Sequence, residues 1–385
     1  MPLQATSGAA SYDAFGGGVP VVPNYIEDVF NVWLYTGTGA NQNIVNGIDL
    51  AGKGGLTWIK SRDSTVTQYT HNMLVDTVRG AYNRLISNLT NGQFTNGPVS
   101  SFNSNGFSLD TINSSIGNES GGSYVSWTFR KQPKFFDVVT YTGTQGVGGS
   151  GQAINHNLGS EPACIIIKPI NDSGTNWTVY HRGLSSPFTQ QLLLNSTAAV
   201  ATNSNKVKAV SSTTFTAGWE LAFDTVQYVA YIFAHNAGGF GLTGTDNVIS
   251  CGSYTATGND NINLGFEAQW VLHRRANTDS EWYIQDIQRG MSLTSSQQLQ
   301  PNASDAEGTF TGDITSPTAT GFHNGLWGSG TIIYIAIRRG PMKVPTSGTS
   351  VFAPIAYTGT GTAGQVTGAN FPPDLFWVKL KKRRF

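Results

Sequence analysis

The sequence predicts an all-β protein built from tandem β-sandwich modules of the jelly-roll type, and three observations lead to this fold class. Short β-branched and aromatic runs such as ACIIIK, YVAYIF and TIIYIAI are separated by clusters of Gly, Asn, Ser, Thr and Asp, which is typical of strands and turns. The phrase YTGT at 35–38 returns at 141–144 and 357–360, and as YTAT at 254–257. These intervals of roughly 105 residues match a whole domain, whereas propeller blades and solenoid repeats are shorter. About nine short strands per repeat is the content of a sandwich.

The repeat extends well beyond this phrase. About 20 residues later, each copy has an apolar strand that ends in a basic residue: LTWIKSRD at 56–63, CIIIKPIND at 164–172, WVLHRRAN at 270–277 and LFWVKLKK at 375–382. An Arg-Gly pair follows in the three complete copies, and each of these closes on an aromatic strand, YVSWTFRK, YVAYIFAH or IIYIAIRR. We therefore interpret the chain as a duplicated domain.

The repeat divides the chain into five segments. These are an extended N-terminal arm at 1–29, module 1 at 30–134, module 2 at 135–246, module 3 at 247–345 and the start of a fourth module at 346–385. Pro, Gly and polar residues at 130–135, 235–247 and 338–350 are typical of domain linkers, so we expect a string of domains that each own a core. The fourth copy stops within its second strand, which favours a fragment of a longer polypeptide; a swapped strand that completes module 3 is the alternative. The best helix candidate is 71–88.

Composition excludes several function classes. Charged residues make up 12% of the chain, and 23 basic residues balance 23 acidic ones, so no long-range field favours nucleic acid or an anionic membrane. The N-terminus lacks the pattern of a signal peptide and no apolar run is long enough to span a membrane, so we expect synthesis in the cytoplasm without membrane insertion. Cys164 and Cys251 fit two buried free thiols better than a disulfide framework or a metal site.

With these motifs aligned, residues 30–385 resemble the concanavalin-A-like lectin/glucanase sandwich domains repeated in virion proteins of tailed phages, especially phages of marine bacteria. The residues that carry the resemblance are YTGTG, NIVNGIDL, GLTWIKSRD and HNMLVDTVRG within 35–80, with weaker copies later in the chain. The N-terminal MPLQATSGAASYDAFGGG also looks like the starts of phage tail and fibre proteins. The resemblance implies a structural role in a virion, such as a tail fibre, spike or capsid appendage.

No pattern in the sequence carries catalytic chemistry. Glucanases of this fold place two carboxylates close together on one strand, but the nearest pattern here is WELAFD, whose Glu220 and Asp224 would share a strand face about 13 Å apart. Asp63, Asp172 and Asp246 lie in turns and fit backbone hydrogen bonds better than Ca²⁺ ligands. The histidines are scattered, at 71, 156, 181, 235, 273 and 323. We expect no catalytic residue, no cofactor-binding residue and no metal ligand, and hence no enzyme.

Three sets of recurring residues have structural interpretations. Arg79, Arg182 and Arg289 fit a buried arginine that pairs with a carboxylate or carbonyl, followed by a glycine turn with positive φ; a ligand-binding arginine is the alternative. The strand-ending lysines fit edge or solvated charges: Lys60, Lys168 and Lys379. The repeat-aligned tryptophans fit sandwich core better than glycan-stacking surfaces: Trp58, Trp127, Trp219, Trp270 and Trp377.

Taken together, the sequence predicts a non-enzymatic structural protein of a tailed-phage virion, most simply a tail fibre or tail appendage that projects toward the host surface. We expect it to contact other tail or capsid subunits through the arm and module 1, and to form a homo-oligomer, with a trimer as the state that a fibre favours. One alternative is a host-recognition spike that binds or degrades carbohydrate on host surface glycans. Another is a capsid decoration or knob protein.

Overall fold

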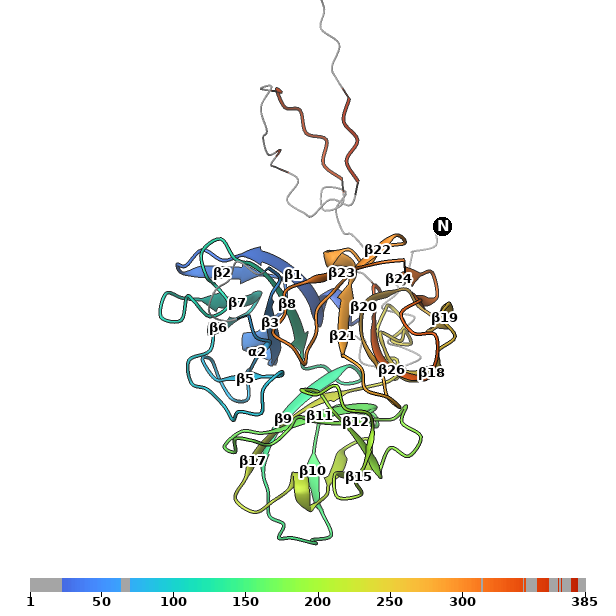
Figure 1. Ribbon diagram of the computed structural model, residues 1–385. Coiled ribbons are helices and arrows are strands. Elements are labelled where there is room, and N and C mark those ends of the chain that lie inside the picture. The colour runs from blue at the N-terminus through green and yellow to red at the C-terminus, as the bar shows by residue number, and fades with distance from the viewer. Residues whose placement is uncertain are drawn as a thin grey trace, which may run out of the picture. The chain divides into compact units, whose positions relative to one another are not determined.

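The computed structural model describes residues 23–63, 70–312, 314–341, 343, 352–359, 366, 368 and 375–379. The chain forms two compact units, residues 1–341 and residues 342–385. The first unit is built almost entirely of antiparallel β-sheet, which confirms the all-β sandwich prediction (Figure 1). In the second unit the described residues include no strand or helix.

Module 1 is a sandwich of two sheets. The larger sheet has the order β1 (Phe30–Thr36), β8 (Ser123–Arg130), β3 (Gly55–Ser61), β4 (Met73–Asp76) and β5 (Arg84–Ile86). The smaller sheet has the order β2 (Gln42–Val45), β7 (Gly106–Leu109) and β6 (Val99–Asn103), and a short helix, α2 (Leu50–Lys53), follows β2 in the chain. Ile44, Ile59, Met73 and Phe107 belong to the apolar core that the two sheets enclose.

Modules 2 and 3 repeat this arrangement. The larger sheet of module 2 has the order β14 (Ala201–Thr202), β13 (Gln190–Leu193), β12 (Thr178–His181), β11 (Cys164–Pro169), β17 (Gln227–Phe233) and β9 (Phe136–Thr142), and its smaller sheet is β10 (Gln152–Asn155), β16 (Thr214–Ala217) and β15 (Val207–Val210). The larger sheet of module 3 has the order β18 (Ile249–Thr255), β26 (Thr331–Arg338), β20 (Ala268–Arg275) and β21 (Tyr283–Asp286). Its smaller sheet is β19 (Asp260–Asn263), β25 (Gly321–Asn324) and β24 (Thr315–Thr318), beside a hairpin of β22 (Ser295–Gln298) and β23 (Gly308–Thr311). In every module the last strand therefore lies between the first and third.

The repeated phrase marks the end of the first strand in each sandwich. Tyr35 stacks on Tyr124 and Tyr141 stacks on Tyr228, with ring centroids 5.2 and 5.1 Å apart. The glycine of the phrase is required by close packing, because a Cβ at Gly37 would lie 2.2 Å from the Glu119 carbonyl oxygen. The same positions therefore hold the first and last strands together in modules 1 and 2, whereas module 3 has Ala256 in place of the glycine.

Besides the apolar cores inside the sandwiches of modules 1 and 3, the three modules share one large central core, which a string of independent domains would lack. Side chains alternate along β3, so that Ile59 faces the small sheet of module 1 while Trp58 packs with residues of modules 2 and 3 in one large cluster. Every residue of β3 is consequently buried, because the strand is covered on both faces. Trp270 of module 3 reaches the same cluster, where its ring lies 5.8 Å from that of Phe129.

The expected linkers and arm are also packed. Phe135 and Phe240, at the two module junctions, are fully buried and contact each other edge to face at 6.3 Å. Residues 1–22 of the predicted arm lie outside the described residues, but Ile26, in the 3₁₀ turn η1 (Ile26–Asp28), is buried in the central core. The Ile26 amide donates to the Pro341 carbonyl at 3.2 Å, so the two chain ends of this unit meet.

The helix candidate at 71–88 is wrong, because this stretch forms β4 and β5. Both strands are buried on both faces and contain short continuous apolar runs, Met73–Val75 and Leu85–Ile86, which periodicity alone does not separate from a buried helix. For the predicted fourth module at 346–385, most residues lie outside the described ones. The described apolar side chains there are exposed, and Trp377 is 89% exposed, so its assignment to a core is contradicted.

Candidate functional site

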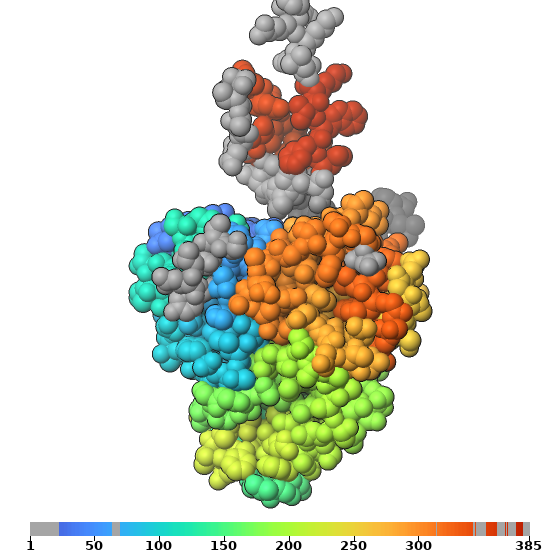
Figure 2. Space-filling view, in the orientation of Figure 1, coloured from blue at the N-terminus to red at the C-terminus, as the bar shows by residue number. Residues whose placement is uncertain are grey.

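The candidate site is the set of three interfaces that close modules 1, 2 and 3 into a ring. Each module contacts the next through the same two surfaces. One module contributes the strands equivalent to β4 and β5 of module 1, with the loop that follows them. The next module contributes the third and last strands of its larger sheet. Such head-to-tail contacts are heterologous and close when the rotation between copies fits a ring. Figure 2 shows the modules in contact along the visible face, module 1 in blue to cyan, module 2 in green to yellow and module 3 in orange.

A buried cation crosses each interface from the third strand of the larger sheet. The Lys60 ammonium donates to the carbonyls of Ser304 (3.1 Å) and Asp305 (2.7 Å) in module 3. The Lys168 ammonium donates to the Thr90 carbonyl of module 1 at 2.9 Å. The Arg274 guanidinium donates to carbonyls of module 2 at Ser196, Thr197 and Ala198, with distances of 3.1, 2.9 and 2.9 Å. Lys60, Lys168 and Arg274 each stand two residues after a central-core residue of the same strand, so the two-residue alternation of side chains turns all three toward the interfaces.

A second contact repeats one strand away, just before β4, β12 and β21. The Trp177 indole nitrogen donates to the carbonyls of Ile86 and Leu89 in module 1, at 3.0 and 3.1 Å. The Trp282 indole nitrogen donates to the Leu193 carbonyl of module 2 at 2.9 Å. In module 1 the position is Asn72, whose amide donates to two carbonyls of module 3 at 2.8 Å each. Each module thus satisfies backbone carbonyls that its neighbour leaves buried.

Buried acids complete two of the interfaces. Asp76 accepts from the Arg79 guanidinium at 2.6 Å and from the Tyr231 hydroxyl of module 2 at 2.8 Å. At the same position in module 3, Asp286 accepts from Arg289 at 2.7 Å and from the Trp127 indole nitrogen of module 1 at 3.0 Å. Gly80 and Gly290 follow the arginines with φ of 90° and 99°, as the sequence predicted.

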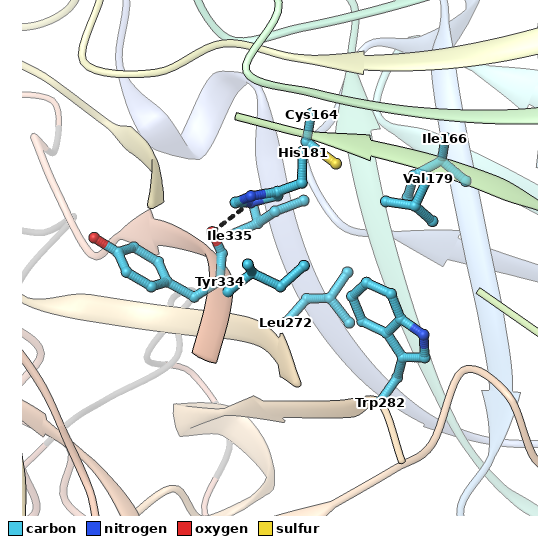
Figure 3. A pocket seen from close by; sticks show the side chains of 9 residues that line it. Cys164, Ile166, Val179, His181, Leu272, Trp282, Tyr334 and Ile335 are labelled. Atoms are coloured by element: carbon cyan, nitrogen blue, oxygen red, sulfur yellow. Dashed lines mark hydrogen bonds between the residues drawn. The ribbon is translucent and has the colours of Figure 1, made fainter. Parts of the chain in front are cut away.

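The interface between modules 2 and 3 has a histidine where the other two have these acids. His181 donates through Nε2 to the Tyr334 carbonyl at 3.0 Å and accepts through Nδ1 from the Gly183 amide at 3.0 Å (Figure 3). An apolar crevice too narrow for a water molecule lies beside the ring, lined in part by Ile166, Leu272 and Trp282. Burial lowers the pKa of His181 to about 4, which favours the neutral ring that this hydrogen-bond pattern requires.

The structure corrects two of the recurring sets. The Arg-Gly pair of module 2 is not equivalent to the others: Arg182 is exposed, and Gly183 has no positive φ, because His181 itself occupies the position of Asp76. The solvated-charge assignment of Lys60 and Lys168 is also wrong, since both are buried. Burial lowers the pKa of each of these two ammonium groups to about 8.

The remaining predicted residues do not gather at one place. Glu220 lies in a 3₁₀ turn, η2 (Trp219–Leu221), and pairs with Lys206 at 3.0 Å, so the strand face it was expected to share with Asp224 is wrong. Asp63 accepts from the Ser123 amide and Asp172 from the Thr175 hydroxyl, as turn residues do. Several histidines have separate partners: His71 contacts Asn88, His156 accepts from the Leu158 amide, His235 accepts from the Cys251 amide and His273 contacts Gln285.

Other predictions concern burial. Cys164 and Cys251 are buried free thiols, as expected, and burial raises the pKa of both. Trp58, Trp127 and Trp270 are buried, although in the central core, and Trp219 is half-buried. Asp246 pairs with Arg338 at 3.1 Å, and His323 is half-buried. Lys379 lies in the second unit, without a strand around it.

Comparison with known proteins decides the family. A family described as a domain of unknown function, DUF7483, matches residues 26–341. The chain belongs to the DUF7483 family. The matched range ends at the residue whose carbonyl accepts from Ile26, so the DUF7483 unit is the closed ring of three modules. No curated protein matches the chain.

The described part of the DUF7483 chain also bears on membranes and metals. None of the helices in the described ranges is long and apolar enough to cross a bilayer. Within residues 23–63, 70–312, 314–341 and the described part of the second unit, no group of three or more His, Cys, Asp or Glu side chains is placed to hold a metal ion.

The interface residues that sequence reasoning missed are Asn72, Trp177, Arg274 and Trp282. The sequence does hold a signal for Arg274. Lys60, Lys168 and Arg274 each stand two residues after an apolar residue of the third strand, Trp58, Ile166 or Leu272, and therefore lie on the same face of the strand. A cation on the buried face of a strand indicates a polar interface.

Proposed function

We propose that this DUF7483 protein is a non-enzymatic structural component of a tailed-phage virion, in which the three-module ring acts as one rigid body on a tail fibre or tail appendage. The observation that carries the proposal is the ring itself. Its buried cations and indoles bind carbonyls of the neighbouring module, so these groups serve to hold the modules together.

The meeting of the chain ends determines how such a body would be mounted. Because the Ile26 amide bonds to the Pro341 carbonyl, segments before residue 26 and after residue 341 leave from neighbouring points. A ring attached in this way is a pendant knob, with its sandwiches held away from the attachment point. Reach would then come from the flanking segments, and we propose that these contact other tail or capsid subunits.

The same observation favours the capsid decoration alternative to a similar degree, since a knob with both tethers on one side can be fixed to a shell as well as to a tail. A homo-oligomer, with a trimer as the state a fibre favours, remains part of the proposal. A ring that already contains three modules removes the need for trimerisation to bury these sheets, so oligomerisation would involve the flanking segments.

Carbohydrate recognition on the host is a second candidate, favoured by one feature. A polar depression of about 190 Å³ lies between modules 1 and 2, where Asn91, Gln93 and Phe94 meet Asn171 and Ser173. Amide side chains beside an aromatic ring offer hydrogen bonds and an apolar surface, which a sugar can use.

The experiment that tests the proposal is cryo-electron microscopy of phage particles purified from cells that produce the protein, with a search for density that fits the ring of residues 26–341. Ring density attached to the tail would support the fibre or appendage role, and ring density on the shell would support decoration. Absence of the protein from purified particles would refute both. A glycan array with the recombinant chain, and with Phe94→Ala as the matched variant, tests the carbohydrate alternative separately.

A further inference from the structure

The interface between modules 2 and 3 is chemically different from the other two. Asp76 and Asp286 face a guanidinium across a short contact, whereas the equivalent position in module 2 is His181 and the residue three positions later is Leu184. The equivalence follows from register, since Asp76, His181 and Asp286 lie opposite Leu56, Cys164 and Trp270, which begin the repeated motif of the third strand.

Both ring nitrogens of His181 are committed in its neutral form. Nε2 bears the proton that it donates to the Tyr334 carbonyl of module 3, and Nδ1 is the acceptor for the Gly183 amide. The Gly183 turn is itself part of the contact: a Cβ built there would lie 3.0 Å from the Gly252 carbonyl oxygen of module 3. A second proton on the ring would therefore place two donors face to face at this turn.

The surroundings offer no compensation for a positive charge. The titratable groups around the imidazole are Cys164, opposite it on β11, Arg182 in its own turn and His235 at the junction. Cys251 of β18 acts on Cys164, and Tyr334 of β26 offers the imidazole its carbonyl while its phenol points away (Figure 3). Among the described groups that act on the ring electrostatically, none is a carboxylate, and Arg182 and His235 both disfavour the charged form. The adjoining crevice is apolar and too narrow for water, so the imidazolium becomes hydrated only when the interface opens.

We propose that the interface between modules 2 and 3 is an acid-sensitive joint, in which protonation of His181 at Nδ1 releases the Gly183 turn and separates module 3 from module 2. At the other two interfaces the equivalent residues are Asp76 and Asp286, and the charge of each is compensated by a buried guanidinium, so those interfaces remain closed. The His181 imidazole has a pKa of about 4 when buried and its ordinary value when exposed. This difference favours opening of the interface by on the order of 50- to 100-fold at pH 4.5 relative to pH 8.

The test is hydrogen–deuterium exchange of the full chain at pH 7.5 and 4.5, corrected for the intrinsic pH dependence of exchange. We expect peptides covering β12 and β26 to open about 50- to 100-fold more at pH 4.5, while peptides of the other interfaces change much less. His181→Gln, which keeps a donor and an acceptor but does not titrate, should remove most of this response. His181→Leu provides a second non-titrating variant if the glutamine variant fails to fold.

Two matched controls separate this joint from general acid effects. His273→Gln removes a buried histidine inside the sandwich of module 3, where Gln285 and Asn324 contact the ring, and it should leave the response of β12 and β26 intact. His235 accepts from the Cys251 amide at the same junction, and burial lowers its pKa to about 4 as well, so His235→Gln should lower the response but leave the share of His181. A response that is undiminished in both His181 variants, disappears in His235→Gln, or spreads equally over the three interfaces would overturn the proposal.

Discussion

The contact of Asp286 with Trp127 should be a strong point of the ring, because it joins modules that are distant in sequence. Asp286 is fully buried and accepts three hydrogen bonds, from the Arg289 side chain at 2.7 Å, the Arg289 amide at 2.9 Å and the Trp127 indole at 3.0 Å. Asp286→Asn keeps the shape but removes the nearer of two carboxylates that pair with the buried guanidinium, the other being Glu307 at 3.3 Å. We therefore expect the free energy of unfolding to fall by about 3 kcal/mol, the lower end of the range for breaking a buried pair.

The contribution across the interface can be isolated with Trp127→Phe. This change removes the indole donor and leaves an aromatic ring in the core, and a hydrogen bond to a charged group contributes about 1.5–3 kcal/mol. Because Asp286→Asn weakens the same bond that Trp127→Phe removes, the loss in the double variant should be smaller than the sum of the single losses by about 1–2 kcal/mol.

Urea unfolding of the four proteins, followed by far-UV circular dichroism and tryptophan fluorescence, measures these free energies. Glu267→Gln is the matched control, because its pair with Arg339 is 35% and 52% exposed and should contribute less than about 1 kcal/mol. Additivity of the Asp286 and Trp127 substitutions, or a loss below about 1 kcal/mol for Asp286→Asn, would refute the assignment of this contact as an interface bond.

Three further outcomes follow from the structure. Gly37→Ala should lower the midpoint of thermal unfolding by several degrees, because the new Cβ collides with a backbone carbonyl, whereas Ala256→Gly, which removes one buried methyl group at the equivalent position, should lower it by less. Trp177→Phe should destabilise the chain by about 1–3 kcal/mol in urea titrations, since two carbonyls of module 1 lose their donor. Burial lowers the pKa of Lys60 and Lys168 to about 8, so around that pH the unfolded chain binds more protons than the folded chain. Stability measured in urea should therefore rise between about pH 7.5 and 8.5, below the range in which loss of protons from unfolded Cys164 and Cys251 opposes the effect, and a fall there would contradict the burial of the lysines.

Much of the fold could be predicted from sequence, because its signals are local. The phrase at Tyr35 combines a strand end with a glycine that a close backbone contact requires, and these constraints recur whenever the module is duplicated. The Arg79 interpretation succeeded for a similar reason, since the arginine, its acid and its glycine lie within five residues of one another.

The interfaces could not be predicted in the same way, because each joins residues 70 or more positions apart. Lys60 looks like a solvated strand end when module 1 is considered alone, and its carbonyl partners lie some 245 residues away in module 3. The Arg-Gly pair of module 2 imitates the other two copies at a shifted register, so comparison of the motifs does not align His181 with Asp76. Only strand pairing identifies it as the counterpart of Asp76.

The polar groups at the interfaces also determine the order of the modules. A buried cation facing carbonyls adds little net stability over an apolar contact, but a mismatched polar group left without a partner costs about 1–3 kcal/mol. Asp76 accepts from Tyr231 of module 2, and Asp286 accepts from Trp127 of module 1. Tyr231 and Trp127 occupy the same position on the last strand of their modules, and the residue at that position in module 3 is Ile335. If module 1 were followed by module 3 in the ring, Asp76 would face Ile335 and lose the donor across the interface, keeping only Arg79.

This specificity matters because the contacts are heterologous. The surface that module 3 offers to module 1 within one chain is equally available to module 1 of a second copy, and unclosed contacts of this kind propagate into filaments. Covalent linkage raises the effective concentration of the intrachain partner to the millimolar range, which favours closure within the chain. The Ile26 to Pro341 hydrogen bond lies where the ring closes, so we infer that residues 24–29 help to complete the closed ring.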